Sequence, residues 1–564
     1  MDSQRPFLYL TLIFLGFLLW TTWQADHAPK PETPAIQQSA TDSVDGSSVP
    51  DASAAGVPAN TATGAIPTEN ALSTAQGVQI IKVRTDVLDL QISTKGGDIV
   101  VADLPTYPVS LEEPDNPSRI LDRAGKNYVA QSGLQHAAVT GLDGDALAKL
   151  APNHLANYTA AQTVFQMEEG TDELVVPMTW QSPDGVTVTK RYHFKRGNFE
   201  IKVEHEVQNN SPQMWTGTEY RQLMHGPDNT ERSLLMGVQA FVGGAYYNKD
   251  KYDTISFDDM SEGLSTEDDK ATGGWVSMMQ HYFVSAWVPP QTEQTQYYSR
   301  EIRTLGVPGY ILGARSPMKQ VASGAKDTFQ TSLWIGPKLQ EDLEVIAEGL
   351  DLTVDYGIFA FISKPIFWMM KLIHGVVQNW GWTIIFLTLF IKLLFFWPSA
   401  ASYKSMAKMK AMAPKLKELG ERYENDPQAK QKAMMEIYRK EKLNPLGGCL
   451  PILIQIPVFM GLYWVLLESV EIRQAPWLLW YKDLSIMDPY FVLPLIMGAS
   501  MYLQQKLNPP QVDPMQQKIF QFLPVVFTFM FLWFPAGLVL YWVVNNLLSI
   551  AQQWYINKKI IGHA

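Results

Sequence analysis

The 564 residues include a single cysteine, Cys449, so the chain cannot form an internal disulfide, and a cysteine-based metal cluster is not expected. The sequence also lacks a G-x-x-x-x-G-K-[ST] phosphate loop, and nothing in it indicates ATP hydrolysis. The histidines between residues 78 and 345 lack the spacing of metal ligands and are interpreted as ordinary surface or core residues. We therefore expect no cofactor, no bound metal and no enzymatic activity.

Residues 24–77 contain no aromatic side chain and are rich in Ala, Pro, Ser, Thr and Asp. Such a segment buries too little apolar surface to offset the cost of ordering, so we expect a disordered tether. It follows an apolar run, FLYLTLIFLGFLLWTTW, that ends at Trp23. The large Trp23 stands where a signal-peptidase site needs a small residue, which favours an uncleaved membrane anchor over residues 1–23.

Residues 78–345 have mixed polarity, and apolar side chains recur there with a period of two. In the stretch VTVTKRYHF the apolar side chains share one face: Val186, Val188, Tyr192 and Phe194. The stretch NFEIKVEHEV repeats the pattern. Alternation of this kind is typical of half-buried antiparallel strands, and its extent predicts one large all-β sandwich.

Beyond residue 345 the chain is apolar with a helical pattern. Residues 346–379 are interrupted by Lys364, Pro365, Lys371 and His374, which suits a helix lying along a membrane surface better than one crossing it. A core of five membrane spans is predicted over residues 380–556, at about 381–397, 450–470, 490–507, 519–534 and 537–555. With the anchor, the chain is expected to be a polytopic helical membrane protein with six spans.

The loops between the spans predict the orientation. Residues 399–445 carry eleven Lys and Arg against six Asp and Glu, a net charge of +5, whereas residues 471–488 are slightly acidic. Because basic loops stay in the cytoplasm, residues 399–445, 508–518 and the tail 557–564 are placed inside and 471–488 outside. Both termini are then cytoplasmic.

Lys392 lies inside the first core span, WTIIFLTLFIKLLFFWP, five residues before Trp397. A basic residue at the centre of a span costs about 2.5–3.5 kcal/mol on insertion scales, so its presence needs a reason. The side chain can extend to the nearby interface. Pairing with Glu468 is disfavoured, because the two residues lie toward opposite ends of their helices. The remaining explanation is that Lys392 faces a polar cavity.

Polar side chains recur on all five core spans. Each one by itself is more typical of helix–helix contacts, but one polar face per helix would let them converge on a hydrated cavity. Pro457, Pro494 and Pro524 would add kinks that keep such a cavity open. The candidate groove residues are Thr388, Lys392, Gln455, Ser500, Gln504, Gln521, Thr528, Trp542, Asn545 and Ser549.

Residues 399–445 show apolar positions at spacings of three and four, interrupted at the turn ENDP and in part at Pro414, which predicts an amphipathic helical hairpin. One interpretation is a self-packed coiled coil with a solvated basic face. The other is a recruitment surface, because methionine-rich faces adapt to many apolar partners and basic charge favours anionic lipid or ribosomal RNA. The candidate recruitment residues are Met406, Met409, Met412, Tyr423, Met434 and Tyr438.

Three stretches of the core resemble the YidC membrane-protein insertases of Gram-negative bacteria: NPLGGCLPILIQIPVFMGLYW, EIRQAPWLLWYKDLSIMDPY and DPMQQKIFQFLPVVFTFMFLWFPAGLVLYW. GGWVSMMQHYFVSAWVP and DLTVDYG resemble that family's periplasmic domain. The resemblance implies a multi-pass protein of the bacterial inner membrane that helps nascent proteins insert, fold and assemble through a hydrophilic groove. It implies the Sec translocon, the ribosome and anionic phospholipids as partners, no DNA, and action either alone or beside the translocon.

The resemblance also implies one positive residue, usually arginine, in the first core span. This sequence has Lys392 there, which keeps the charge but loses the bidentate fork. Two other functions stay open. An ion-coupled transporter using Lys392 would predict inverted repeats, and none is evident in the five spans. A membrane-anchored carbohydrate-active enzyme would need a carboxylate pair or a His/Glu pair in a cleft.

Overall fold

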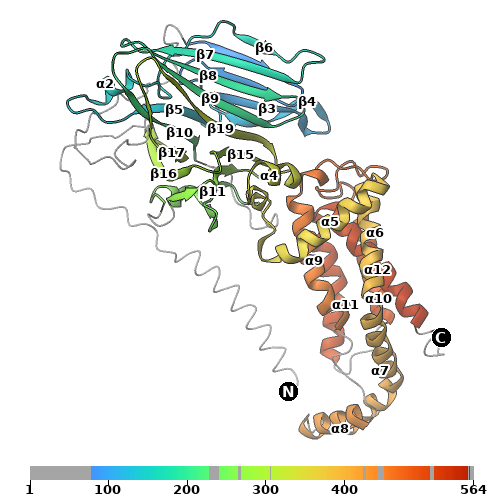
Figure 1. Ribbon diagram of the computed structural model, residues 1–564. Coiled ribbons are helices and arrows are strands. Elements are labelled where there is room, and N and C mark those ends of the chain that lie inside the picture. The colour runs from blue at the N-terminus through green and yellow to red at the C-terminus, as the bar shows by residue number, and fades with distance from the viewer. Residues whose placement is uncertain are drawn as a thin grey trace. The chain divides into compact units, whose positions relative to one another are not determined.

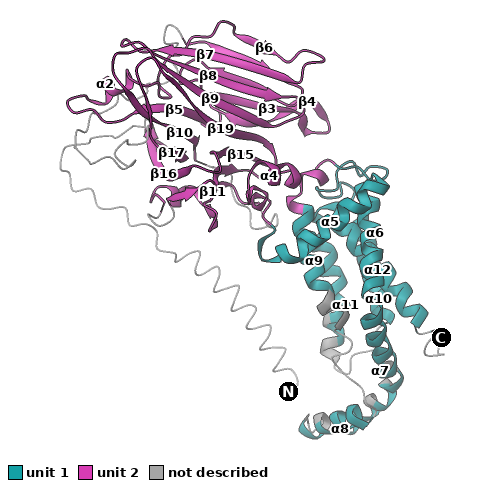
Figure 2. Ribbon diagram, in the orientation of Figure 1, with its two compact units in different colours: residues 1–42, 356–466, 475–564 teal, residues 43–355, 467–474 magenta. Residues whose placement is uncertain are grey.

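The computed structural model describes residues 78–227, 240–264, 269–304, 306–423, 427–440, 450–507, 514–556 and 558. The chain divides into two compact units, which Figure 2 colours separately. The β unit comprises Ser43–Asp355 and Leu467–Gln474, and the helical unit includes Tyr356–Leu466 and Ala475–Ala564. The anchor and tether predicted over residues 1–77 lie outside the described residues.

The β unit contains two sheets (Figure 1). The first sheet contains β1 (Ile80–Arg84), β2 (Asp89–Ser93), β3 (Ile99–Ser110), β4 (Glu113–Asp122), β5 (Val129–His136), β6 (Val164–Gln166), β10 (Trp215–His225), β13 (Lys270–Thr272), β16 (Gln294–Thr304), β17 (Val307–Arg315) and β18 (Lys319–Val321). The second contains β7 (Glu173–Gln181), β8 (Val186–Lys195), β9 (Glu200–Asn209), β11 (Gly243–Tyr247), β12 (Tyr252–Ile255), β14 (Trp275–Met279), β15 (Phe283–Val288) and β19 (Lys326–Pro337). The short helices of the β unit are α2 (Gly144–Ala148), α3 (Phe257–Met260), α4 (Gln340–Ile346) and η2 (Leu350–Thr353).

The large β-sandwich predicted from alternation is confirmed. Strand β8 buries every second side chain from Val186 to Phe194, as the sequence pattern predicts. Strand β9 does the same from Ile201 to Asn209. Strand order in the first sheet is β13-β16-β17-β10-β5-β3-β2-β1-β6, and in the second β12-β11-β14-β15-β19-β9-β8-β7. Pairing is antiparallel along these paths except between β1 and β6, which run parallel.

The alternation also buries charged side chains. Lys190 lies on the buried face of β8, and its Nζ donates to the carbonyl oxygens of Gly96 at 3.0 Å and Ser132 at 2.9 Å, which belong to the other sheet's strands and turns. Gly97 beside it has a φ of +63°, and a Cβ there would lie 3.0 Å from Cδ of Lys190. Glycine is therefore required at this turn both for its backbone and for the approach of the lysine.

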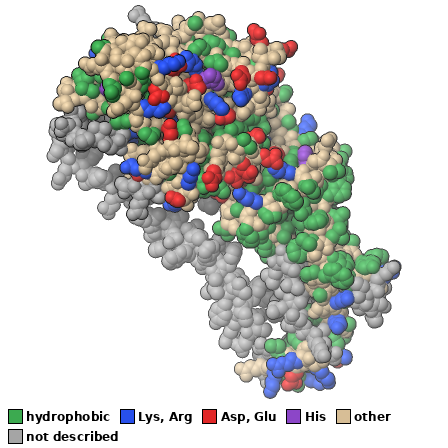
Figure 3. All heavy atoms as spheres, in the orientation of Figure 1, with side chains coloured by type: hydrophobic (Ala, Val, Ile, Leu, Met, Phe, Trp, Pro, Cys, Tyr) green, Lys and Arg blue, Asp and Glu red, His purple; other side chains and the backbone are tan. Residues whose placement is uncertain are grey.

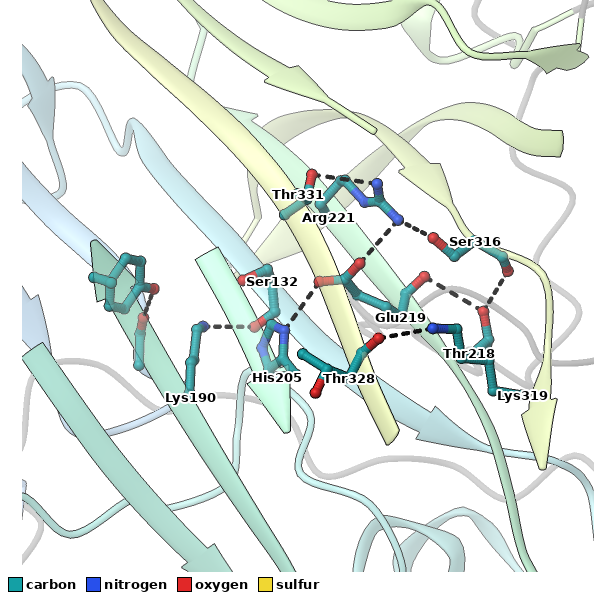
Figure 4. Close-up of polar contacts among 12 residues, drawn as sticks. Ser132, Lys190, His205, Thr218, Glu219, Arg221, Ser316, Lys319, Thr328 and Thr331 are labelled. Carbon is teal, nitrogen blue, oxygen red and sulfur yellow. Dashed lines mark hydrogen bonds and ion pairs between the residues drawn. The ribbon is translucent and has the colours of Figure 1, made fainter. Parts of the chain in front are cut away.

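A second buried cluster crosses from β9 to β10 and β19 (Figure 4). Nδ1 of His205 donates to Glu219 at 2.9 Å, and Nη2 of Arg221 lies 3.0 Å from the other carboxylate oxygen. Arg221 also donates to Thr331 in the opposite sheet at 3.2 Å. Burial alone would raise the pKa of Glu219, but Arg221, His205 and Lys190 together bring it below its usual value. Burial lowers the pKa of His205, so its ring is neutral.

The helical unit is built from eight helices among its described residues. They are α5 (Ala360–Val377), α6 (Trp380–Leu394), α7 (Phe396–Arg422), α8 (Pro427–Lys440), α9 (Leu450–Glu468), α10 (Val492–Leu507), α11 (Pro514–Met530) and α12 (Ala536–Tyr555), with single turns η3 (Gly357–Phe359) and η6 (Phe531–Trp533). Helix α12 packs against α6 and α10, α10 against α11, and α5 against α6.

Three details differ from the sequence-based expectations. The first predicted span is broken, because α6 ends at Leu394 and α7 begins at Phe396 with a bend of 68° between them. Helix α7 continues through Pro414, so the interruption expected there is wrong. Pro494 lies in the first turn of α10, where its missing N–H removes no helical bond, so it is not a kink.

One continuous stretch of helix, Gly357–Val377, is long and apolar enough to cross a membrane, among the described residues. It includes α5, for which the sequence predicts a position along the membrane surface. The bent pair formed by α6 and the first part of α7 passes the same test together, and Gln455–Glu468 and Phe520–Trp533 are shorter apolar helices. The length and apolar content of the helices therefore do not by themselves determine the number of membrane spans.

Replacing Glu219 with alanine should leave the Arg221 guanidinium buried without its carboxylate. A buried charge that loses its partner costs about 3–5 kcal/mol, so the free energy of unfolding should fall by about that amount. Denaturant unfolding of the purified protein, followed by tryptophan fluorescence, measures it. Glu173→Ala removes an exposed pair with Lys195 and should cost at most about 1 kcal/mol. Equal effects of the two variants would contradict the importance of burial.

Stability should also fall on acidification. His205 and Glu219 both have a lower pKa in the folded protein, so the unfolded chain binds more protons as the pH drops. The loss should begin near the ordinary histidine pKa of about 6.5 and continue below the ordinary glutamate pKa of about 4.3. Thermal unfolding across this pH range measures it, and His205→Gln should remove the part of the loss that begins near pH 6.5.

Candidate functional site

Lys392 lies in the last turn of α6, where its positive charge complements the helix C-terminus. The side chain is half-buried, and its Nζ donates to Oγ of Ser549 on α12 at 2.7 Å. Ser549 in turn donates to the carbonyl of Asn545, one turn earlier on α12, at 2.7 Å. The structure therefore brings three of the predicted groove residues together across the α6–α12 contact.

Four of the predicted groove residues are buried by helix packing. Thr388 donates to the carbonyl of Ile384 in its own helix at 2.6 Å, and Ser500 donates to that of Met497 at 2.7 Å. Such bonds satisfy a hydroxyl inside an apolar helix without help from water. The buried members are Thr388, Ser500, Asn545 and Ser549. In this structure they act as contacts between helices.

Asn546 is a buried polar residue that the sequence-based selection missed. Its Nδ2 donates to Oγ of Ser500 at 3.0 Å and joins α12 to α10. The spacing along α12 places Asn545 on the same face as Ser549, whereas Asn546 faces α10. Two adjacent asparagines in an apolar helix are the signal that could have indicated contacts on two sides.

Helix α11 contains Pro524, which cannot donate to the carbonyl of Phe520 four residues earlier. Gln505 of α10 donates its side-chain amide to this carbonyl. The α10–α11 contact is also close at Gly498, where a Cβ would lie 3.2 Å from Cβ of Thr528. The proline is therefore accommodated by a side chain of the neighbouring helix, as backbone groups in an apolar surrounding require.

The remaining groove candidates keep part of their surface free. Gln455, Gln504, Thr528 and Trp542 are half-buried, and Gln521 is exposed. Gln455 lies one turn before Phe459 on α9, and the ring of Phe459 packs 5.2 Å from that of Trp542. Phe531 lies 6.0 Å from Trp542 and 4.9 Å from Phe534. We call Phe459, Phe531, Phe534 and Trp542 the aromatic cluster.

The segment predicted to be a hairpin contains two helices, α7 and α8, and their arrangement as a hairpin stays a prediction. Figure 3 shows Lys and Arg side chains on their surface. Met406 is buried in a cluster with Ala400, Tyr403 and Ile556, so in this structure it packs within the helical unit and is not open to a partner. The other candidates are half-buried: Met409, Met412, Tyr423, Met434 and Tyr438.

The β unit contains a His/Glu pair of the kind that a carbohydrate-active enzyme would need. The side chains of His205 and Glu219 have a relative exposure of 0%, so the pair lies in the core and does not face a cleft. Within the described part of the chain, no group of three or more His, Cys, Asp or Glu is arranged to hold a metal ion. The pair therefore serves the packing of the two sheets.

Two family descriptions match this chain: YidC periplasmic domain over residues 80–369, and 60Kd inner membrane protein over residues 372–563. The Membrane protein insertase YidC of Thioalkalivibrio sulfidiphilus is 51% identical over 561 residues, covering 99% of both chains. That of Methylococcus capsulatus is 48% identical, and that of Stutzerimonas stutzeri 45%, with 99% of each chain covered.

Solved structures were also compared. A crystal structure titled active YidC insertase with the first transmembrane domain resolved is 16% identical, covers 85% of this chain and 95% of its own, and gives a TM-score of 0.38. A putative aldose 1-epimerase from Escherichia coli is 11% identical, covers 46% of this chain and 99% of its own, and gives a TM-score of 0.28. Because these TM-scores are low, the comparison rests on the relatives found by sequence.

The burial of each groove candidate predicts how fast a cysteine substituted at that position reacts with a thiol reagent. In a Cys449→Ser background, cysteine at Gln504 or Gln521 should react with a water-soluble maleimide in nanodiscs, where both faces are open to the reagent. Cysteine at Thr388 or Asn545, which the packing buries, should react at least about tenfold more slowly, a factor that corresponds to roughly 1.4 kcal/mol. Labelling followed by mass spectrometry measures the rates. Similar rates at all four positions would mean that the α6–α12 contact opens to water.

Proposed function

The chain belongs to the YidC family of membrane protein insertases, and we propose that it inserts its clients through a polar groove whose centre is Lys392. The observation that carries the proposal is the hydrogen bond from Lys392 to Ser549, which holds a cation among apolar helices. Identity of 45–51% over the full length to proteins named Membrane protein insertase YidC supports the insertase function. The clients are nascent membrane proteins of the bacterial inner membrane.

The proposed topology has six spans: the anchor over residues 1–23 and five in the core. The first core span includes α6, and the other four are α9, α10, α11 and α12. The basic hairpin 399–445 then lies in the cytoplasm with both termini, and the β-sandwich lies in the periplasm. Helix α5 lies along the outer surface, where Phe361, Trp368 and Val376 expose apolar surface suited to lipid.

The chemistry of Lys392 suits a short acidic or polar client tail. An ammonium has three donors, and within the described residues Ser549 takes one of them. The other two can reach a carboxylate or a peptide carbonyl that enters the groove. In a medium of low dielectric constant such an attraction is much stronger than in water, which compensates for the loss of the tail's hydration. Gln455, Gln504 and Gln521 supply further donors and acceptors along the path.

The aromatic cluster closes the outer end of the groove in this proposal. Phe459, Phe531 and Trp542 come from three different elements and lie on the side of Gln455 toward the C-terminal end of α9. Apolar rings exclude water and ions, so the groove is wet on the cytoplasmic side alone. Once the tail has entered, the apolar segment of the client moves into lipid, gaining about 0.8 kcal/mol per buried CH₂, and this supplies the drive.

The hairpin provides the proposed recruitment surface. The half-buried side chains of Met409, Met434 and Tyr438, with the basic residues beside them, suit an apolar client segment, anionic phospholipid and the ribosome. The protein then works alone or beside the Sec translocon. The transporter alternative is not favoured, because the relatives that match over the full length are named as insertases.

The charge at position 392, more than the shape of lysine, should determine activity. Lys392→Arg should insert acidic-tailed clients at close to the normal rate, because the charge is kept. Lys392→Ala should slow them by about tenfold or more, the effect of losing roughly 1.4 kcal/mol of attraction. Protease protection of a radiolabelled client in proteoliposomes measures insertion.

Two controls separate charge from structure. Lys506→Ala removes an exposed cation near the end of α10 and should insert clients normally. Ser549→Ala keeps the cation at position 392 and removes its hydrogen bond, so activity should fall less than in Lys392→Ala. If Lys392→Ala inserts acidic-tailed clients as fast as the parent protein, the groove role of this charge is refuted.

A further inference from the structure

Residues 475–491 belong to the helical unit and lead directly into helix α10. We call this segment the outer connection. Its backbone is bonded to itself: the N–H of Trp477 donates to the carbonyl of Tyr481 at 2.8 Å, and that of Leu484 donates to the carbonyl of Ala475 at 3.1 Å. The side chains of Tyr481 and Leu484 are buried. The outer connection is therefore a compact loop with a defined structure.

The buried carboxylate of Asp488 is the centre of this loop. Its Oδ1 accepts hydrogen bonds from Nε1 of Trp480 at 3.2 Å and from the backbone N–H of Tyr490 at 3.0 Å. Its Oδ2 accepts from the hydroxyl of Tyr481 at 3.1 Å and from the backbone N–H of Leu493 at 2.8 Å. A carboxylate that accepts four hydrogen bonds fixes the turn around Trp480 against the first residues of α10.

The outer connection is also attached to α6 and α12, which belong to the same unit. The carbonyl of Ile486 accepts at 2.7 Å from the N–H of Ala536, the first residue of α12, which has no acceptor within its own helix. The ring of Trp477 packs on Gly381 of α6, where a Cβ would collide with it. The loop therefore has a fixed position relative to α6, α10 and α12.

This fixed loop exposes apolar side chains. Leu479 is 84% exposed and has a φ of +55°, and Phe491 is 39% exposed with a φ of +56°. The rings of Trp480 and Tyr490 lie 5.4 Å apart and bring the two exposed segments together. Non-glycine residues rarely adopt a left-handed backbone, and exposed apolar surface is unfavourable in water. We call the exposed side chains of Leu478, Leu479, Tyr490 and Phe491 the apolar tip.

The length of α10 indicates what covers the apolar tip. Helix α10 has 16 residues, about 24 Å at 1.5 Å per residue, whereas the hydrocarbon core of a bilayer is about 30 Å thick. Phe491 immediately precedes α10, and its carbonyl accepts from the N–H of Leu495, which is itself exposed. The exposed apolar side of the helix thus continues into the tip. The tip adds apolar surface at the end where α10 is too short to cross the core.

We propose that the apolar tip inserts into the outer leaflet of the bilayer, and that Asp488 is the positioning residue that holds it in the inserting conformation. Trp and Tyr are enriched at membrane interfaces, and Trp480 and Tyr490 suit this position. The exposed ammonium of Lys482 can reach lipid phosphate. The proposal rests on the topology given under the proposed function, and it adds an anchor that sets the depth of α10 in the membrane.

The test places a nitroxide at Leu479→Cys in a Cys449→Ser background, in vesicles of phosphatidylethanolamine and phosphatidylglycerol. Oxygen concentrates in lipid, whereas a nickel chelate stays in water, so their collision rates with the nitroxide distinguish the two surroundings. The nitroxide at position 479 should collide with nickel at least about tenfold less often than one at Lys482→Cys, a preference for lipid of roughly 1.4 kcal/mol. Its collision rate with oxygen should stay high.

Two results would overturn the proposal. A nickel collision rate at position 479 within about twofold of that at position 482 would mean that the tip lies in water. Low collision rates with both oxygen and nickel would mean that protein covers the tip, either the β unit or a second copy of the chain.

The role of Asp488 has its own variants. Asp488→Asn replaces one acceptor oxygen by a donor, so the nickel collision rate at position 479 should rise toward that at position 482. Asp483→Asn is the matched control, because Asp483 accepts only from its neighbour Ser485 through one oxygen among the described contacts, and it should not change the rate. Trp480→Phe removes a single donor and serves if Asp488→Asn does not fold. If neither variant changes the rate, Asp488 does not position the tip.

The anchor and the proposed function can fail separately. In spheroplasts, Lys482→Cys should react with a membrane-impermeant maleimide added from outside. Reaction in inverted vesicles alone would overturn both the outer-leaflet position and the proposed topology. Normal insertion of a client by vesicles in which the nitroxide at position 479 is open to nickel would overturn the anchor and leave the insertase function intact.

Discussion

The bond between Lys392 and Ser549 depends on a constraint that acts throughout the helical unit: a polar group withdrawn from water must find a partner in the protein. An ammonium on an apolar helix is the most demanding case. Helix α12 meets this demand with a hydroxyl that is itself bonded to its own backbone. The same helix supplies Asn546 to Ser500, so α12 joins α6 on one side and α10 on the other.

The constraint explains the prolines as well. Pro524 removes a helical bond from the Phe520 carbonyl, and the side chain of Gln505 replaces it. Gln505, the neighbour of the groove candidate Gln504, thus satisfies a backbone carbonyl of the adjacent helix. The groove that we propose is therefore limited to polar groups that no neighbour satisfies fully, and these are fewer than the polar residues of the core helices.

The β unit meets the same constraint with charges. Lys190 bonds to two carbonyls, and His205, Glu219 and Arg221 bond to one another between the two sheets. These groups fix how the sheets lie against each other, because each buried charge must stay near its partner.

Periodicity in the sequence determined much of this protein. An apolar period of two predicts the buried faces of β8 and β9, and apolar runs predict the positions of α9 to α12. Both predictions succeed because the period of side chains along a strand or a helix is a local property. Sequence alone also singled out Lys392. Tertiary structure decided which polar residues are satisfied: the alternation that buried Val188 also buried Lys190, and only the opposite sheet shows why that is tolerated. It likewise decided that Asn546 and Gln505 are contacts between helices, and that residues 467–474 belong to the β unit. Which group becomes the hydrogen-bond partner of a buried polar side chain depends on which distant segments of the chain come together. The local spacing of residues does not contain that information.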